Sequence, residues 1–113
     1  MVTQPAAALG VVRVARQALS TIVTNAALQI PGVTRIAHGG DQWSRLLGRE
    51  IPKQGIHLTV KDNTLSADLY LVVTPGSNIV EVGSAVQQEV ASAIEEMVGM
   101  IVREVNVYIQ DVA

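Results

Sequence analysis

The chain has 113 residues, a formal net charge of −2 and no cysteine. This length predicts one domain with a single core, and the missing cysteine excludes disulfides, thiolate metal sites and cysteine nucleophiles. The slight negative charge argues against a nucleic-acid-binding domain, since such domains usually carry a basic patch.

The N-terminal quarter leaves two alternatives open. Residues 1–9 are predicted to be a flexible tail, and residues 10–113 a single domain. The three valines of Gly10-Val-Val-Arg-Val-Ala favour a strand over 10–15, because β-branched side chains suit extended backbone. From Arg16 the apolar period of three and four predicts a helix over about 16–29, ended by Pro31-Gly32. The alternative is one helix from about Ala7 to Ile30. The predicted buried stripe comprises Ala18, Leu19, Ile22, Val23, Ala26 and Ile30.

The middle of the chain predicts three strands. A short strand over 32–38 is followed by Gly39-Gly40 and an irregular connection over 41–52 with a helical turn. Apolar and polar residues then alternate over 56–61 and 65–71, which predicts a hairpin with Asp62-Asn63 as a two-residue turn. The resulting register places Val60 opposite Leu65, Leu58 opposite Ala67, and His57 opposite Asp68.

The C-terminal part predicts a helix and a strand. Asn78 can cap a helix over 78–98, with Glu81 three residues later, and Gly99 can end it. The predicted buried stripe of this helix comprises Ile79, Val82, Val86, Val90, Ala93 and Met97. The last strand covers 100–112, with Val105, Val107 and Ile109 on one face and Glu104, Asn106, Tyr108 and Gln110 on the other.

Together these elements predict an α+β, two-layer sandwich in the order β-α-β-β-β-α-β. Both helices should pack on one face of a mostly antiparallel sheet, and loss of the first strand would still leave two layers. The other sheet face is then exposed and offers an interaction surface comprising His57, Asp68, Tyr70, Asn106 and Tyr108. Few charged residues or prolines protect the last strand beyond Arg103 and Glu104, so its edge is a second candidate for self-association.

The candidate chemical groups are few, and each has a simpler structural explanation. His38 beside Gly39-Gly40 could belong to a ligand loop, but a strand end with a turn is the better explanation. His57 facing Asp68 could be a base with its carboxylate, yet no nucleophile accompanies the pair. A phosphate could sit at the helix start after Gly76, although ordinary capping accounts for these residues. Glu95-Glu96 could meet a basic partner or simply be solvated. No catalysis, cofactor or metal site is expected.

Several stretches of the chain resemble the alkaline shock protein family. They are Gly10-Val-Val-Arg-Val-Ala, Ile30-Pro-Gly-Val, Gly55-Ile-His-Leu-Thr-Val, Asp68-Leu-Tyr-Leu-Val-Val, Gly76-Ser-Asn-Ile-Val-Glu-Val, Val86-Gln-Gln-Glu-Val, Ile94-Glu-Glu-Met-Val-Gly-Met and Val102-Arg-Glu-Val-Asn-Val. The chain departs from the family pattern at Thr74-Pro75-Gly76 and at Arg16. The resemblance implies a non-enzymatic protein of the envelope stress response in bacteria with Gram-positive-type envelopes.

Two functions follow as expectations. The first is a structural and interaction protein that forms homo-oligomers. It would be cytoplasmic and held near the membrane through a membrane-anchored protein partner, as the family resemblance implies. The sequence shows neither a signal peptide nor an apolar run of about 18 residues, so no direct membrane span is expected. The alternative is a small-ligand-binding regulatory domain, with the open sheet face or the loop after His38 as its site.

Overall fold

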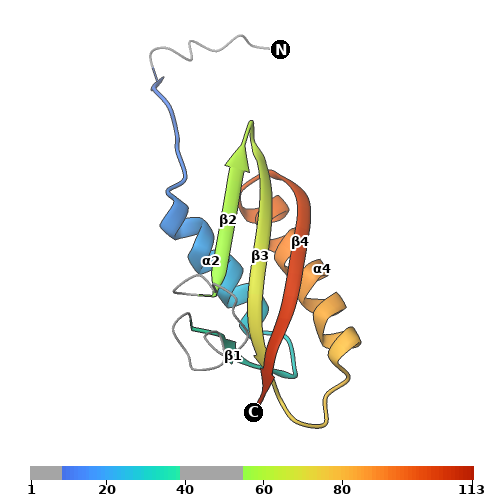
Figure 1. Ribbon diagram of the computed structural model, residues 1–113. Helices are drawn as coiled ribbons and strands as arrows, with labels where there is room; N and C mark the ends of the chain where they lie inside the picture. Colours follow the sequence, from blue (N-terminus) through green and yellow to red (C-terminus); the bar gives the residue numbers. More distant parts are fainter. Residues whose placement is uncertain (1–8, 39–54) are drawn as a thin grey trace.

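The computed structural model describes residues 9–38 and 55–113, and they form two layers (Figure 1). The elements are α2 (Arg16–Leu28), β1 (Val33–Ile36), β2 (Ile56–Lys61), β3 (Thr64–Val73), α4 (Ile79–Met97) and β4 (Ile101–Val112). Both helices lie on the same face of the four-stranded sheet, as the sequence predicted. The α+β sandwich is therefore confirmed. The predicted tail and the connection over 41–52 lie outside the described residues, apart from Leu9.

β3 is the central strand of the sheet. β4 pairs with it in parallel from Thr64 to Val73 and so takes one whole edge of β3. β2 and β1 pair with it antiparallel, β2 along Thr64–Leu69 and β1 along Leu71–Val73. These two strands must therefore share the other edge, one after the other. They meet at Tyr70, whose N–H donates to the Gly55 carbonyl at 2.8 Å and whose carbonyl accepts from the Ala37 N–H at 2.8 Å.

The hairpin forms with the predicted turn and register. Asp62 and Asn63 have φ values of 52° and 60°, the left-handed geometry that a two-residue type I′ turn requires. Val60 pairs with Leu65, Leu58 with Ala67, and His57 with Asp68. Because side chains alternate along a strand, this register directs Leu58, Leu65, Ala67 and Leu69 toward the helices, where all four are buried.

The second helix has the predicted ends but a shifted buried stripe. The Asn78 side chain accepts from the Glu81 N–H at 3.1 Å, and Gly99 follows the helix with a φ of 78°. The buried residues of α4 are Val82, Val86, Val90 and Ile94, which recur every four residues. The prediction was wrong for Ile79 and Met97, which are 43% and 69% exposed. Neither residue belongs to this series with a spacing of four, which ends at Ile94.

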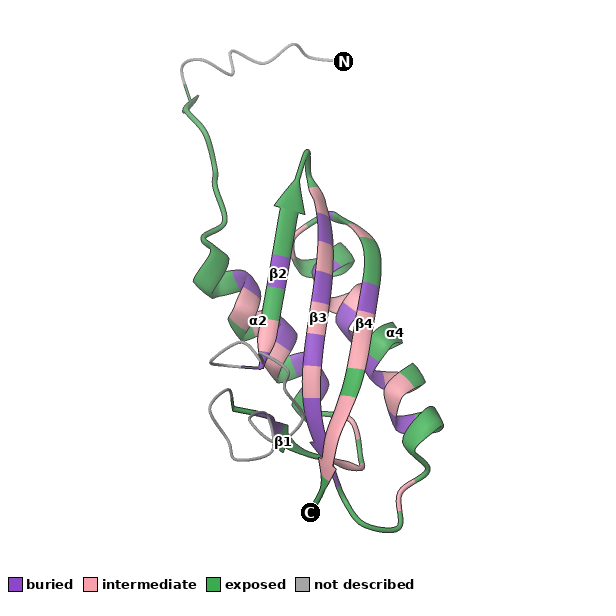
Figure 2. Cartoon of the chain, viewed as in Figure 1, coloured by how far each residue is buried: buried purple, intermediate pink, exposed green. Residues whose placement is uncertain are grey.

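The buried stripe of the first helix, α2, also differs in part from the predicted one. Its buried residues are Leu19, Val23, Ala26 and Ala27, while Ile22 and Ile30 are half-buried. The prediction for Ala18 was wrong, because Ala18 lies on the exposed side of the helix. The two helices pack against each other as well as on the sheet, so their apolar stripes close one core with β3 at its centre (Figure 2).

The strand predicted over 10–15 is not formed. These residues are neither strand nor helix, and all of them are exposed. The alternative of one helix from Ala7 to Ile30 is also wrong, since α2 begins at Arg16. A valine-rich segment favours extended backbone, but a strand also needs a neighbouring edge to bond with. In the described part of the chain, this segment has no such edge beside it. We call residues 9–15 the N-terminal arm.

Candidate functional site

The five residues of the predicted interaction surface lie in two neighbouring rows across the sheet. In the first row, Asp68 of β3 pairs with His57 of β2 and with Asn106 of β4. In the second row, Tyr70 pairs with Tyr108. Residues that are partners across strands point to the same face, so all five side chains share the face that the helices do not cover. We call this face the open face.

The first row is a polar ladder. The Asn106 side-chain amide donates to Asp68 Oδ1 at 2.9 Å and to Glu104 Oε2 at 3.3 Å. Asp68 is half-buried, while His57 on its other side is exposed. The hydrogen-bond partner of the Asp68 carboxylate is thus the Asn106 amide of β4, on the more buried side. This arrangement is an ordinary way to satisfy a half-buried carboxylate on a sheet surface.

The second row is aromatic. The rings of Tyr70 and Tyr108 are stacked, with centroids 4.8 Å apart and an angle of 17° between their planes. Tyr108 is 37% exposed and Tyr70 is half-buried. The pair forms a flat aromatic surface in which Tyr108 is the more exposed ring. Such amphipathic rings are enriched at protein interfaces.

Part of the open face is buried, which the sequence analysis missed. Val72 follows Tyr70 on the same side of β3 and is only 1% exposed. Ala37, which bonds to the Tyr70 carbonyl, is 2% exposed. A signal was present in the run Leu71-Val-Val, because consecutive apolar residues indicate a strand that is buried on both faces. The open face is therefore polar beside β2, whereas beside β1 it combines the buried Val72 with its exposed cross-strand partner Arg35.

Two helix side chains bond to the outer edges of the sheet. On the β2 side, Arg16 Nη1 donates to the Leu58 carbonyl. On the β4 side, Gln87 Nε2 donates to the Val105 carbonyl at 3.0 Å. Edge strands expose unpaired backbone groups, and here each helix provides a side-chain donor for one carbonyl of the edge strand beside it. The prediction of a weakly guarded last strand is thus corrected at Val105.

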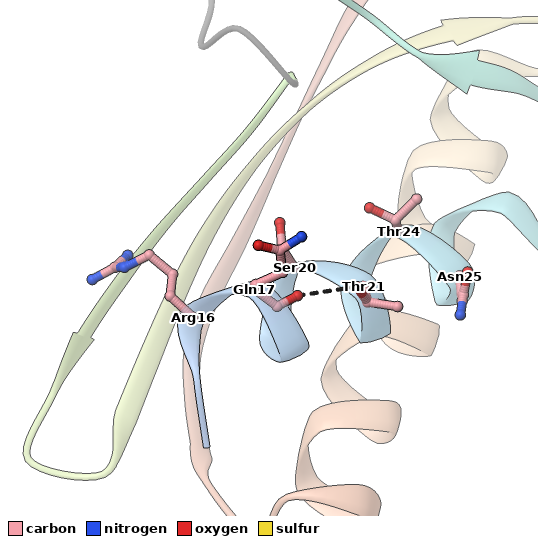
Figure 3. A pocket seen from close by; sticks show the side chains of 6 residues that line it. All are labelled: Arg16, Gln17, Ser20, Thr21, Thr24 and Asn25. Carbon is pink, nitrogen blue, oxygen red and sulfur yellow. Dashed lines mark hydrogen bonds between the residues drawn. The ribbon is translucent and has the colours of Figure 1, made fainter. Parts of the chain in front are cut away.

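The described residues line several surface hollows. One of about 450 Å³ lies on the polar side of α2 (Figure 3). Its described lining comprises Arg16, Gln17, Ser20, Thr21, Thr24 and Asn25. The Thr21 hydroxyl donates to the Gln17 carbonyl at 3.0 Å, within the helix itself. These groups come from one helix face and do not converge on a common point, so the hollow gives little support to the ligand-binding alternative.

A second hollow, of about 520 Å³, lies between α2 and α4 and includes Glu89, Glu96 and the exposed Met97. A third, of about 450 Å³, lies beside the start of α4 and includes Gly32, Asn78 and Glu81. Here the Asn78 side chain caps the helix and the nearby charge is acidic, which favours capping over a phosphate site. His38 is exposed at the end of its segment, and Gly39-Gly40 lies outside the described residues.

The described residues contain no group of three or more His, Asp or Glu side chains that could hold a metal ion. Within residues 9–38 and 55–113, no helix is long and apolar enough to cross a membrane.

Comparison with known families decides the classification. The sequence model of the alkaline shock protein 23 family, which has a cell envelope-related function, matches residues 4–113. The chain belongs to the alkaline shock protein family. The resemblance seen in the sequence is therefore confirmed, and so is the envelope-related character of the family.

Curated relatives of this family member come from Gram-positive bacteria. Spy1614 of Streptococcus pyogenes is 29% identical over 106 residues, which cover 91% of this chain and 88% of the relative. YloU of Bacillus subtilis is 24% identical over the same coverage. YqhY, also of Bacillus subtilis, is 26% identical over 102 residues, or 89% of this chain and 76% of the relative. All three bear the name of uncharacterized proteins.

Solved structures of MamM CTD variants share the fold of this family member. One variant superposes with a TM-score of 0.55 and 16% identity, covering 88% of this chain and 100% of the other. A nickel form of another variant gives a TM-score of 0.54 and 16% identity over 86% of this chain and 99% of the other. At this identity the likeness shows the fold alone.

Proposed function

We propose that this alkaline shock protein is a non-enzymatic structural and interaction protein of the cell envelope, which acts by self-association and by binding partners. The observation that carries the proposal is the open face, where the stacked pair Tyr70 and Tyr108 lies beside the polar ladder of Asp68 and Asn106. The envelope-related function of the family supports the cellular setting.

The chemistry of the open face suits a reversible contact. The two tyrosine rings offer apolar area with little conformational entropy to lose, because each side chain has only two flexible torsions. The neighbouring ladder is already hydrogen-bonded within the monomer, so it can enter an interface without leaving unpaired groups. The exposed His57 gives the rim of the surface a polar character. A contact of this kind would be modest in affinity and would depend on protein concentration.

The proposal includes no catalysis by the chain itself. His57 is the residue that could act as a base, and its cross-strand partner Asp68 bonds to Asn106. No serine or threonine nucleophile is hydrogen-bonded to His57 in the described residues. A substitution of His57 by Ala should therefore act only as a change at an exposed position.

The proposed location is cytoplasmic and next to the membrane, through a membrane-anchored protein partner. The family's envelope-related function supports a site near the envelope. Co-purification from the native cell tests partner and location together. Recovery of a membrane-anchored protein with the wild-type chain, and its loss with the Tyr70→Ala/Tyr108→Ala variant, is the expected result.

Light scattering across a concentration series tests self-association directly. The average mass of the wild-type protein should rise with concentration, and the double tyrosine variant should shift this rise to higher concentration. Thr59→Ala is a matched control, because Thr59 lies on the same face one row beyond His57. A protein that stays monomeric at high concentration, with and without the tyrosines, would refute the proposed self-association.

A further inference from the structure

Residues 10–15 of the N-terminal arm form neither helix nor strand, and the Ala15 carbonyl accepts from the Leu19 N–H of α2 at 3.2 Å. Val11, Val12 and Val14 are 76%, 95% and 44% exposed. Ala15, where the arm joins α2, has an extended backbone with φ −68° and ψ 148°. β-branched residues in extended backbone need only a neighbouring strand edge to become a strand. The arm is therefore suited to extend a sheet.

The outer edge of β4 offers a place for such a strand. The Val105 carbonyl accepts from Gln87 of α4, which shows that this residue directs its backbone groups away from β3. Pairing with β3 is regular from Glu104 to Ile109, and alternate residues of a strand point their backbone groups the same way. Val107 and Ile109 must therefore also direct their N–H and carbonyl groups outward. The part of the edge beyond Val105 has these groups to offer.

A flank of α4 lies above this edge and is partly apolar. Gln87 bonds to Val105, and a Cβ on Gly83 would lie 3.9 Å from a methyl group of Val107. Val80, one turn earlier on the same flank, is 77% exposed. Val107 and Ile109 are only half-buried beneath this flank. A strand added here could bury its valines against Val80 and both of these residues, and the missing side chain of Gly83 leaves room for it.

The arm cannot reach this edge within its own chain. It continues directly into α2, and Arg16 at the start of α2 bonds to Leu58 of β2. β2 and β4 lie on opposite sides of β3, and the arm leaves the molecule on the β2 side (Figure 1). In the same chain, the edge of β2 between Leu58 and the turn at Asp62 has one residue, Val60, whose backbone N–H and carbonyl point away from β3. A full pairing therefore requires another copy of the chain.

We propose that the N-terminal arm of one copy adds as a strand to the outer edge of β4 in a second copy. This inference rests on the proposed self-association and adds a second contact to that of the open face. Four residues, Val11–Val14, span about 13 Å as a strand, which is the length of Val107–Gln110. Arg13 brings a positive charge to an edge that ends in Asp111. Donor and acceptor lie on opposite sides of the molecule, so the contact is head-to-tail.

Cross-linking tests the proposal, because the chain has no cysteine of its own. A copy with Val12→Cys is mixed with a differently tagged copy with Val80→Cys, and a short bis-maleimide is added. Cross-linked pairs between the two copies should form at least about tenfold faster than in a control in which Leu28→Cys replaces Val80→Cys. The reason is that a bound arm raises the local concentration of the thiol introduced at Val12 beside Val80 and not beside Leu28. Leu28 is 45% exposed on the other helix. Equal rates for the two combinations would overturn the proposal.

Light scattering gives a second readout that separates this inference from the proposed function. Val12→Asp should weaken association by about tenfold or more, because a buried valine is replaced by a charge. Its melting temperature should not change, since Val12 is 95% exposed in the monomer. Leu9→Asp is the matched control, because Leu9 is 81% exposed and precedes the proposed strand. Equal effects of both changes would overturn the proposal.

If Val12→Asp associates like the wild type while the double tyrosine variant does not, the arm contact is wrong and the proposed function stands. If neither change matters and the wild type remains monomeric, both are wrong.

Discussion

The side chain of Gln87 in α4 donates a hydrogen bond to the carbonyl of Val105 in β4 at 3.0 Å. This bond joins the helix layer to the outer edge of the sheet, where a backbone acceptor would otherwise face water. An unpaired edge is a template for another strand, so a side chain that occupies one of its groups limits where pairing can begin. Gln87 thereby marks the boundary between a protected and an accessible part of β4.

Replacing Gln87 by Leu should lengthen the accessible edge. The free energy of unfolding should fall by about 0.5–1.5 kcal/mol, the usual contribution of one such hydrogen bond. Self-association, measured by light scattering, should increase because the Val105 carbonyl becomes available. Gln88→Leu is the control, since Gln88 is exposed on the neighbouring position of the helix. Equal association of both variants would show that the bond does not protect the edge.

The hairpin and its register could be read from the sequence because both depend on local geometry. Asp62-Asn63 tolerates left-handed backbone, and the alternation of apolar residues then leaves one register that buries Leu65 and Leu69. The same register placed His57, Asp68 and Tyr70 on the open face. The residues of the candidate surface that lie on regular strands were thus predictable from the sequence.

The remaining features depend on contacts between distant parts of the chain. Arg16 bonds to Leu58, and Gln87 bonds to Val105. No repeating pattern of apolar and polar residues predicts either contact. The strand predicted over 10–15 failed for a related reason, because local propensity cannot supply the edge that a strand needs. The burial of Val72 on the open face likewise depends on how β1 follows β2 along β3.

The shifted stripe of α4 gives a direct test of the core. Ile94 is fully buried, while Met97, which the sequence placed in the core, is 69% exposed. Ile94→Ala should lower the free energy of unfolding by about 2–5 kcal/mol, because it removes buried methylene groups and leaves a cavity. Met97→Ala should change it by less than about 0.5 kcal/mol. Urea denaturation followed by circular dichroism measures both, and a reversed order would contradict the observed packing.

The cap of α4 should contribute measurably to stability. Asn78→Ala removes the acceptor for the Glu81 N–H and should cost about 0.5–2 kcal/mol, whereas Asn78→Ser should keep most of the stability. Asn25→Ala is the control, because Asn25 is exposed within α2 and caps nothing. Thermal denaturation distinguishes the three variants. Equal melting temperatures for Asn78→Ala and the wild type would mean that the bond contributes nothing.

Two glycines with similar backbone geometry should respond differently to alanine. Gly55 and Gly76 have φ values of 67° and 86°, so alanine at either position incurs about 1–2 kcal/mol for left-handed backbone. A Cβ on Gly76 would meet nothing within 4 Å. A Cβ on Gly55 would overlap the carbonyl of Ala37 and lie 2.7 Å from a methyl group of Ile36.

Gly55→Ala should therefore cost about 1–3 kcal/mol more than Gly76→Ala, the usual range for overpacking. The clash lies where β1 and β2 meet, and the two strands bond to Tyr70 at that point. We expect Gly55→Ala to move these strands apart and to disturb the stacking of Tyr70 on Tyr108, and so to weaken self-association as well. Urea denaturation measures the first effect and light scattering the second. Equal losses of stability in the two variants would show that β1 and β2 are not in close contact at Gly55.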